Sequence, residues 1–213
     1  MTQPTRLVVP ANVRVFVVGA NGTGKSFWTN HAYHDTKRLI VCDGKGMIKN
    51  DEWRLQKWSN TAFRRLRNER HEGRYRIGPR KVAEWEQLFE RLLELRNVTI
   101  IIDELSAVGT TGQSEGLRGL LQRGRELGIA MCCSTQRPTF IPLNTMSEAS
   151  IFVQFRLRMQ TDKERMREVI PDLQFENYQA YVWDIDPIGH EFIYYDDIQG
   201  KAWFYDHLNV VHK

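Results

Sequence analysis

Short apolar runs, rich in Val and Ile, alternate along this chain with longer stretches whose apolar positions recur every three or four residues. The first pattern is typical of strands buried in a sheet and the second of helices that cover it. Strands are predicted at 13–18, 38–43, 97–105 and 129–135, and helices at 25–32, 79–96 and 113–127. A strand, a helix and a second strand within 13–43 form a βαβ unit, so consecutive strands are expected to be parallel. The sequence therefore predicts an α/β fold with a mainly parallel sheet flanked by helices.

The pattern changes after residue 143. A short helical turn is predicted at 144–149 and a charged helix at 162–169. Residues 151–159 alternate apolar and polar side chains, which predicts a strand with Gln154, Arg156 and Arg158 on its polar face.

Beyond Pro171 the pattern favours a small antiparallel extension. Strands at 178–185 and 191–195 flank the turn sequence Asp186-Pro187-Ile188-Gly189, and 201–205 is a candidate further strand. We therefore expect the 213 residues to form a single domain. Its predicted parts are a leader (1–12, with an edge strand at 7–9), a core (13–170) and a C-terminal β-hairpin extension (171–213).

The formal net charge of +4 permits a polyanionic partner without requiring one. Its distribution matters more, because residues 53–81 concentrate basic side chains among aromatic ones. This mixture is typical of a surface that contacts a phosphate backbone, although a solvated surface or a subunit contact explains it as well. The basic residues are Arg64, Arg65, Arg67, Arg70, Arg74, Arg76, Arg80 and Lys81, and the aromatic ones are Trp53, Trp58, Phe63 and Tyr75.

Two classes of protein are disfavoured. No apolar run approaches the roughly 20 residues that a membrane-spanning helix needs, and the N-terminus does not read as a signal peptide. Cys42, Cys132 and Cys133 are odd in number, and two are adjacent within an apolar run. We expect them to be reduced core residues of an intracellular protein.

Candidate chemistry begins directly after the first strand. Residues 19–26, GANGTGKS, match G-x-x-x-x-G-K-[ST], the P-loop or Walker A pattern, in which backbone N–H groups converge on phosphates. Lys25 is expected to reach the β- and γ-phosphates of ATP, and the Ser26 hydroxyl to bind Mg²⁺. A chance glycine-rich turn is disfavoured by the strand before it and the helix after it. The predicted nucleotide-binding residues are Gly19, Ala20, Asn21, Gly22, Thr23, Gly24, Lys25, Ser26 and Phe27.

Carboxylates and an amide follow other predicted strands. Asp103 and Glu104 end the strand at 97–105 in a Walker B pattern, with Asp103 expected to hold Mg²⁺ and Glu104 to act as the base that polarises water. The alternative is a pair of exposed strand-end carboxylates. Gln136 follows the strand at 129–135, where a side-chain amide can sense the γ-phosphate. Asp43 ends the second strand, and we favour a turn or cap role for it.

Arginines follow the Walker B strand. On the helix at 113–127, Arg118, Gln122 and Arg125 share one flank, while Arg123 points elsewhere. Arginines on such a flank are usually only solvated. A cation from a neighbouring subunit would nevertheless complete a hydrolytic site, and this helix supplies Arg118, Arg123 and Arg125 as candidates for that role.

Four segments together resemble a known family: GANGTGKS, IIIDEL, LRGLLQRGRELGIAMCCSTQRPTFIP and NTMSEASIFVQFRLRMQTDKERM. Over 13–170 the chain is similar to the FtsK–HerA superfamily of hexameric DNA-pumping ATPases, which have a RecA-like P-loop fold. GRELGI, a strand and STQRP resemble that superfamily's arginine-containing helix and post-strand glutamine. Arg125, in GRELGI, matches the superfamily's arginine best, and Arg118 is the alternative. The compact chain is similar to genome-packaging ATPases of membrane-containing double-stranded DNA viruses, of the tectivirus type and related archaeal viruses.

The resemblance implies a function. It implies that ATP with Mg²⁺ is hydrolysed at the interfaces of a hexameric ring, catalysed by Lys25, Glu104 and Gln136 and by Arg125 in trans, while double-stranded DNA passes through the pore. Capsid-vertex or portal proteins are the expected further partners. The expected location is the host cytoplasm or the packaging vertex of a virion.

Two other functions stay open. One is a P-loop kinase of a small metabolite, which Glu104 beside Asp103 disfavours because a kinase must suppress attack by water. The other is a nucleotide-switched assembly or secretion protein. Stimulation of ATP turnover by DNA would separate a motor from both.

Overall fold

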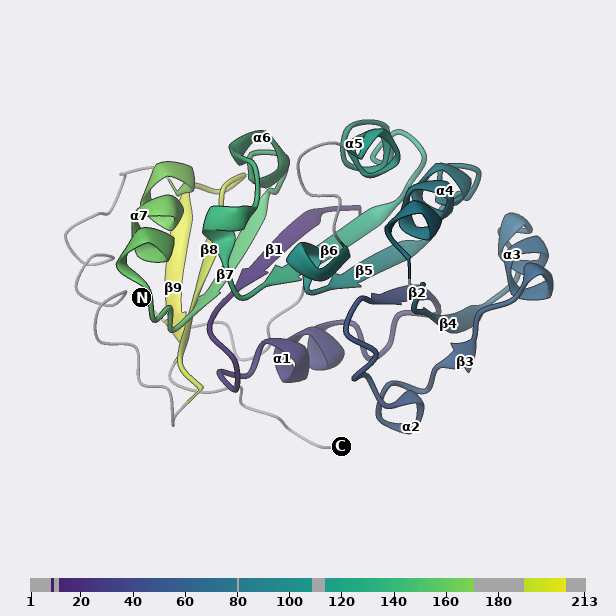
Figure 1. Cartoon of the computed structure of the whole chain (residues 1–213), viewed down its shortest axis with the longest axis horizontal. Helices are drawn as coiled ribbons and strands as arrows, with labels where there is room; N and C mark the ends of the chain where they lie inside the picture. The colour runs from purple at the N-terminus through teal and green to yellow at the C-terminus, as the bar shows by residue number, and fades with distance from the viewer. Residues whose placement is uncertain (1–8, 10–11, 80, 109–113, 171–189, 206–213) are drawn as a thin grey trace.

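The computed structural model describes residues 9, 12–79, 81–108, 114–170 and 190–205. These residues build one nine-stranded sheet in the order β3-β4-β2-β5-β6-β1-β7-β8-β9 (Figure 1). The strands from β3 to β7 in this order are parallel, and β8 and β9 are antiparallel to their neighbours. The strands are β1 (Arg14–Val18), β2 (Arg38–Asp43), β3 (Gln56–Lys57), β4 (Gly73–Ile77), β5 (Thr99–Asp103), β6 (Ala130–Thr135), β7 (Ile151–Phe155), β8 (Phe192–Asp196) and β9 (Lys201–Tyr205).

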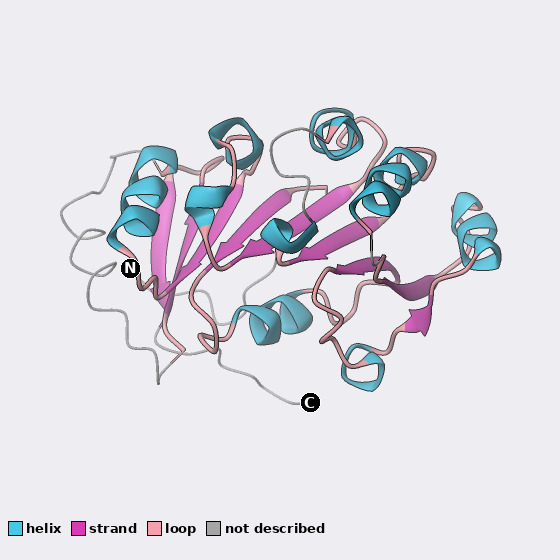
Figure 2. Cartoon of the chain, in the orientation of Figure 1, coloured by secondary structure: helices cyan, strands magenta, loops and turns pink. Residues whose placement is uncertain are grey.

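Helices cover both faces of this sheet, as Figure 2 shows. Alternate residues of β1 belong to two separate cores: Phe16 and Val18 pack with α3, α4 and α5, whereas Val15 and Val17 pack with α1 and α2. The helices are α1 (Lys25–Ala32), α2 (Asn50–Trp53), α3 (Asn60–Arg67), α4 (Val82–Leu92), α5 (Glu115–Arg123), α6 (Leu143–Met146) and α7 (Gln160–Val169), with 3₁₀ turns η1 (Leu105–Val108) and η2 (Pro138–Phe140). The predicted α/β fold with a mainly parallel sheet and an antiparallel C-terminal addition is confirmed.

Several predicted element bounds were wrong. The helix predicted at 79–96 begins only at Val82, where Lys81 N–H donates to the Glu84 carboxylate, and it ends at Leu92. The helix predicted at 113–127 is α5, which begins after Ser114 accepts a hydrogen bond from the Leu117 N–H. The elements β3, α3 and β4 within the basic segment 53–81, and α2 at its start, were not predicted.

The strand predicted at 151–159 is the five-residue β7, and the prediction of one polar face was wrong. Every residue of β7 is buried, including Gln154, because the strand lies between β1 and β8 with both faces covered. Arg156 and Arg158 lie beyond its end and are exposed.

At the C-terminus the hairpin is formed by β8 and β9, so the candidate strand at 201–205 is confirmed. β8 pairs with β7, which joins the hairpin to the main sheet. The predicted strand at 178–185 and the turn at 186–189 lie outside the described residues. Val9 is the one described residue of the predicted edge strand at 7–9, and it is in no strand.

Candidate nucleotide-binding site

The P-loop joins the carboxyl end of β1 to the amino end of α1. Gly24 caps α1 with a φ of 105°, a left-handed conformation that favours glycine. Gly19 lets the loop backbone lie close to Phe155, because a Cβ at position 19 would lie 2.6 Å from the Cβ of Phe155. The predicted strand–loop–helix unit is therefore present, with the free N–H groups of a helix N-terminus at its end.

Lys25 is folded back onto this loop. Its Nζ donates to the carbonyl oxygens of Gly19 at 2.7 Å and Ala20 at 2.9 Å. Burial lowers the Lys25 pKa to about 8, partly opposed by the charge of Glu104. Ser26 and Phe27 are exposed at the start of α1, with Phe27 57% exposed. A buried ammonium and an exposed hydroxyl thus lie within one turn of α1.

Asp103 is the last residue of β5, and its Oδ1 accepts a hydrogen bond from Ser134 Oγ at 3.1 Å. Burial raises the pKa of Asp103 above its ordinary value. A nearby divalent cation would stabilise the ionised carboxylate, so this position suits a metal ligand.

Glu104 leaves the strand in a left-handed conformation, with a φ of 59°. Its side chain is buried and accepts hydrogen bonds on Oε1 from Ser106 Oγ, Thr135 Oγ1 and the Gln136 N–H, at 2.6, 2.9 and 3.2 Å. Burial would raise the pKa of Glu104, but the hydrogen bonds from Ser106, Lys45 and the Gln136 N–H lower it. Glu104 is therefore held ionised, as a base that activates water requires.

Lys45 was missed by sequence reasoning. Its Nζ lies 2.9 Å from Glu104 Oε2, although the two residues are 59 positions apart. The sequence signal for Lys45 was its place in the turn Gly44-Lys45-Gly46, which follows β2. Neighbouring parallel strands end at the same edge of the sheet, so a residue just after β2 can lie beside one just after β5. Asp43 has the turn role that was favoured for it: its carboxylate accepts the N–H groups of Gly46, Met47 and Ile48.

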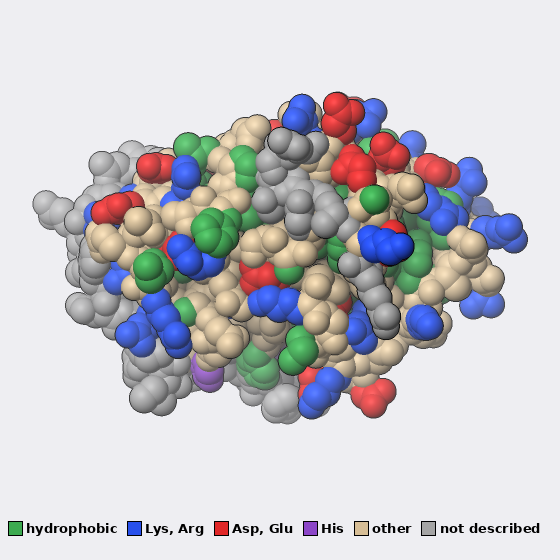
Figure 3. All heavy atoms as spheres, in the orientation of Figure 1, with side chains coloured by type: hydrophobic (Ala, Val, Ile, Leu, Met, Phe, Trp, Pro, Cys, Tyr) green, Lys and Arg blue, Asp and Glu red, His purple; other side chains and the backbone are tan. Residues whose placement is uncertain are grey.

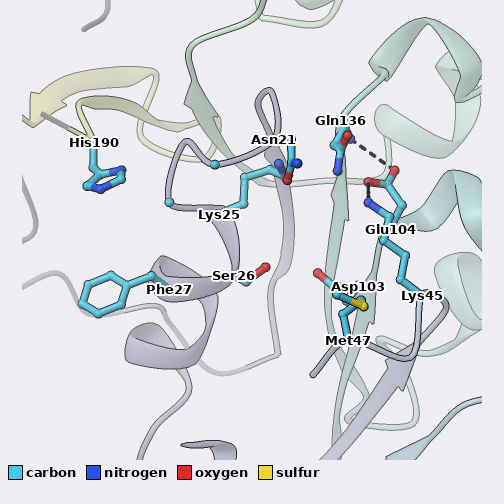
Figure 4. Close-up of a pocket in the computed structure, with 12 residues that line it drawn as sticks. Asn21, Lys25, Ser26, Phe27, Lys45, Met47, Asp103, Glu104, Gln136 and His190 are labelled. Atoms are coloured by element: carbon cyan, nitrogen blue, oxygen red, sulfur yellow. Dashed lines mark hydrogen bonds and ion pairs between the residues drawn. The ribbon is translucent and has the colours of Figure 1, made fainter. Parts of the chain in front are cut away.

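These residues line one cavity of about 630 Å³ (Figure 4). In Figure 4 Lys45, Glu104 and Gln136 lie at one end of the cavity, and Phe27 and His190 at the other, with Lys25 between them. His190 and Met47 were not predicted. The lining residues are Asn21, Gly22, Gly24, Lys25, Ser26, Phe27, Lys45, Met47, Asp103, Glu104, Gln136 and His190.

The donor set fits a magnesium nucleotide. Mg²⁺ prefers oxygen ligands, which the Ser26 hydroxyl and the Asp103 carboxylate offer on opposite sides of the cavity in Figure 4. The three cysteines are free and buried, as predicted, and the part of the chain that the structure describes holds no cluster of three or more His, Cys, Asp or Glu side chains. No described helix is both long and apolar enough to cross a bilayer.

Arg125 is outside this cavity. The C-terminal end of α5 lies at the edge of the sheet opposite this cavity, because α5 runs back to the amino end of β6. Arg125 follows the end of α5, and its Nη2 donates to Ser150 Oγ, just before β7 begins, at 3.2 Å. Within one chain the structure therefore does not bring Arg125 to the other predicted catalytic residues.

The basic segment contains two kinds of arginine. Arg74 donates to the backbone carbonyls of Trp53, Tyr33, His34 and Thr36, and Arg76 pairs with Asp43 at 2.9 Å. These two belong to the fold, and their interpretation as phosphate contacts was wrong.

The aromatic residues of the segment are also structural. Trp53, Phe63 and Tyr75 are buried, and Trp58 packs edge-on against Phe63 and Tyr75. Trp53, Phe63 and Tyr75 are therefore core residues and not a stacking surface for bases. The exposed basic residues of the segment include Arg64, Arg65, Arg67 and Arg70, and Figure 3 shows basic side chains gathered at the α3 end of the molecule.

Solved structures share this fold. The chain is similar to the genome packaging NTPase B204 from Sulfolobus turreted icosahedral virus 2 in complex with AMP: 15% identity, 92% of this chain and 98% of that chain covered, and a TM-score of 0.73. The same NTPase has been solved with AMPPCP and with ATPγS. No protein-family model matches the chain, and no curated protein matches its sequence.

Two larger proteins contain a similar domain. The monomer form of the pCW3 conjugation coupling protein TcpA with ATPγS is 16% identical, with 92% of this chain and 60% of that chain covered and a TM-score of 0.60. The cytoplasmic domain of the type VII secretion ATPase EccC from Thermomonospora curvata is 12% identical, with 95% and 26% covered and a TM-score of 0.57. The expected resemblance to this group of P-loop ATPases is confirmed as a likeness of fold.

Proposed function

We propose that the protein is an ATP-driven translocase of double-stranded DNA that packages a viral genome. One observation carries the ATPase part: Asp103 and Glu104 face Lys25 and Ser26 across a single cavity (Figure 4). The packaging part is supported by the fold, which matches a genome packaging NTPase over nearly the full length of both chains.

The described residues divide the work of hydrolysis. The P-loop N–H groups and Lys25 would bind the β- and γ-phosphates of ATP, and Ser26 and Asp103 would hold Mg²⁺, which neutralises phosphate charge. Glu104 would orient and polarise the attacking water. Gln136, whose backbone N–H already contacts Glu104, would hydrogen-bond the γ-phosphate with its side chain.

The remaining parts of the proposal concern assembly. Arg125 would act in trans within a homo-oligomeric, hexameric ring, because within one chain it lies at the opposite edge of the sheet from Glu104. Exposed arginines of α3 would contact the DNA backbone, with Arg156 and Arg158 as the reserve. Capsid-vertex or portal proteins would be the partners, in the host cytoplasm or at the packaging vertex of the virion.

The test is the ATPase rate with and without long double-stranded DNA. We expect turnover that needs Mg²⁺ and rises with DNA, and no turnover in Lys25→Ala under either condition. An ATPase rate that does not change with DNA of any length would exclude a DNA motor and leave an ATPase of another kind.

A nucleotide-switched secretion or assembly protein is the second candidate, favoured by the similar fold of the type VII secretion ATPase EccC. It predicts slow turnover that responds to a protein partner and not to DNA. A metabolite kinase is disfavoured, because four hydrogen-bond donors hold Glu104 ionised beside the expected phosphate site.

A further inference from the structure

The loop after β2 places Lys45 beside Glu104 and holds the backbone of Lys45 there. Asp43, which is 1% exposed, accepts three backbone N–H groups from residues 46–48 and pairs with Arg76. Asp43 is also the register partner of Asp103, so the residues that follow the two strands lie side by side. Tertiary structure therefore holds the backbone of Lys45 next to Glu104.

The two carboxylate oxygens of Glu104 differ. Oε1 accepts three hydrogen bonds, from Ser106, Thr135 and Gln136, which is more than its two lone pairs accommodate comfortably. Oε2 is paired with Lys45 Nζ at 2.9 Å. A water activated by Glu104 must therefore approach Oε2, which is the oxygen that Lys45 covers.

Lys45 has the freedom to leave this oxygen. Its side chain is 36% exposed, against 6% for that of Glu104, and both line the cavity together with Lys25. An ammonium on a four-carbon chain can change acceptors without backbone movement. A γ-phosphate would place a second, more highly charged anion in the same cavity, in competition for this ammonium.

We propose that Lys45 is a γ-phosphate ligand whose ammonium exchanges between Glu104 Oε2 and the terminal phosphate of ATP, so that the base is released only when a triphosphate is bound. This inference deepens the proposed function and depends on nucleotide binding at the P-loop. It assigns Lys45 a second function besides the structural ion pair, and it limits activation of water to the triphosphate state.

The experiment compares two nucleotides by isothermal titration calorimetry in the presence of Mg²⁺: ADP, and the non-hydrolysable analogue AMPPCP. Lys45→Met should weaken AMPPCP binding about tenfold to a hundredfold and change ADP binding less than about twofold, because a charge-assisted contact to the γ-phosphate is lost. Lys45→Arg should keep most of the preference for AMPPCP. Lys49→Met is the matched control, since Lys49 is in the same segment but pairs with exposed Glu52 at 3.4 Å.

The outcomes separate this inference from the proposed function. An unchanged ratio of the two affinities in Lys45→Met, or an equal loss for both nucleotides, would overturn the exchange and leave a structural ion pair. Failure of the unmodified protein to bind either nucleotide would overturn both proposals. Binding of both nucleotides with no DNA-stimulated turnover would overturn only the DNA motor, and the affinity ratio would still decide the function of Lys45.

Discussion

The cavity at the carboxyl edge of the sheet and the outer face of α3 both gather charge, but they do so in opposite ways. In the cavity Lys25 and Glu104 are 8% and 4% exposed, and each meets two or more fixed partners. On α3 the arginines are exposed, and Arg67 lies 3.8 Å from a Glu94 that is itself half-exposed.

This difference in burial determines how large an effect a single substitution can have. A buried charge has one geometry and is little screened, so its removal leaves partners unsatisfied. An exposed charge is screened by salt, and its neighbours replace most of its effect. We therefore expect large single effects in the cavity and small, additive, salt-dependent effects on α3.

The largest effect is expected at Lys25. Lys25→Ala removes the ammonium that would meet the phosphates, and hydrolysis should be abolished, which a steady-state phosphate-release assay measures. Lys37→Ala is the control, because Lys37 is exposed and pairs only with the exposed side chain of Glu72 among the described residues. If Lys25→Ala binds and hydrolyses ATP at wild-type levels, the assignment of residues 19–26 as a P-loop is wrong.

The next prediction asks whether loss of Arg125, which lies outside the cavity of its own chain, lowers turnover as strongly as loss of a cavity residue. Arg125→Ala should lower turnover about a thousandfold or more, since an arginine that stabilises transferred phosphoryl charge contributes about 10³–10⁵ in rate. Mixed rings of Arg125→Ala and Lys25→Ala subunits should recover activity, because some interfaces then contain both intact parts. Normal turnover by Arg125→Ala alone, with mixed rings that form and stay inactive, would make Arg125 a solvated residue.

Glu104→Gln should still bind ATP and hydrolyse it at least about a hundredfold more slowly, because the base is lost while Asp103 still holds Mg²⁺. Single-turnover kinetics separate the chemical step from binding. Glu126→Gln, at an exposed glutamate after α5, is the control. Turnover within a fewfold of wild type would place the base elsewhere.

The next prediction compares the contributions to stability of two arginines of the basic segment, the hydrogen-bonded Arg74 and the exposed Arg64. Arg74→Ala leaves the carbonyls of Thr36 and Trp53 without the hydrogen bonds that Arg74 donates to them, and the free energy of unfolding should fall by about 2 kcal/mol. Arg64→Ala should change it by less than about 0.5 kcal/mol. Urea denaturation measures both, and equal values would contradict the structural role of Arg74.

The smallest effect per residue is expected on α3. Replacing Arg64, Arg65 and Arg67 together by Ala should weaken DNA binding and lower the salt slope by up to about 3, at roughly 0.9 per phosphate contact. Fluorescence anisotropy with duplexes of unrelated sequence at several salt concentrations provides the measurement. If the slope stays the same, α3 is a solvated or subunit-facing helix.

Local sequence was sufficient for the parts that depend on contiguous residues. The P-loop and the Asp103–Glu104 pair were predictable, because glycine conformations, a helix N-terminus and the end of a buried strand are set within a dozen positions. For the same reason the order of the main strands and helices was predictable, since apolar periodicity reflects which face of each element is covered. The mainly parallel sheet followed from short βαβ spacing.

Tertiary structure decided everything that depends on partners distant in the chain. Lys45 reaches Glu104 only because β2 and β5 are neighbours in register, and Gln154 is buried only because β7 is not an edge strand. Arg74 was indistinguishable from Arg64 in the sequence, since both are basic residues between aromatic ones. The function of an arginine depends on the acceptors around it, and those acceptors come from segments that only the folded chain brings together.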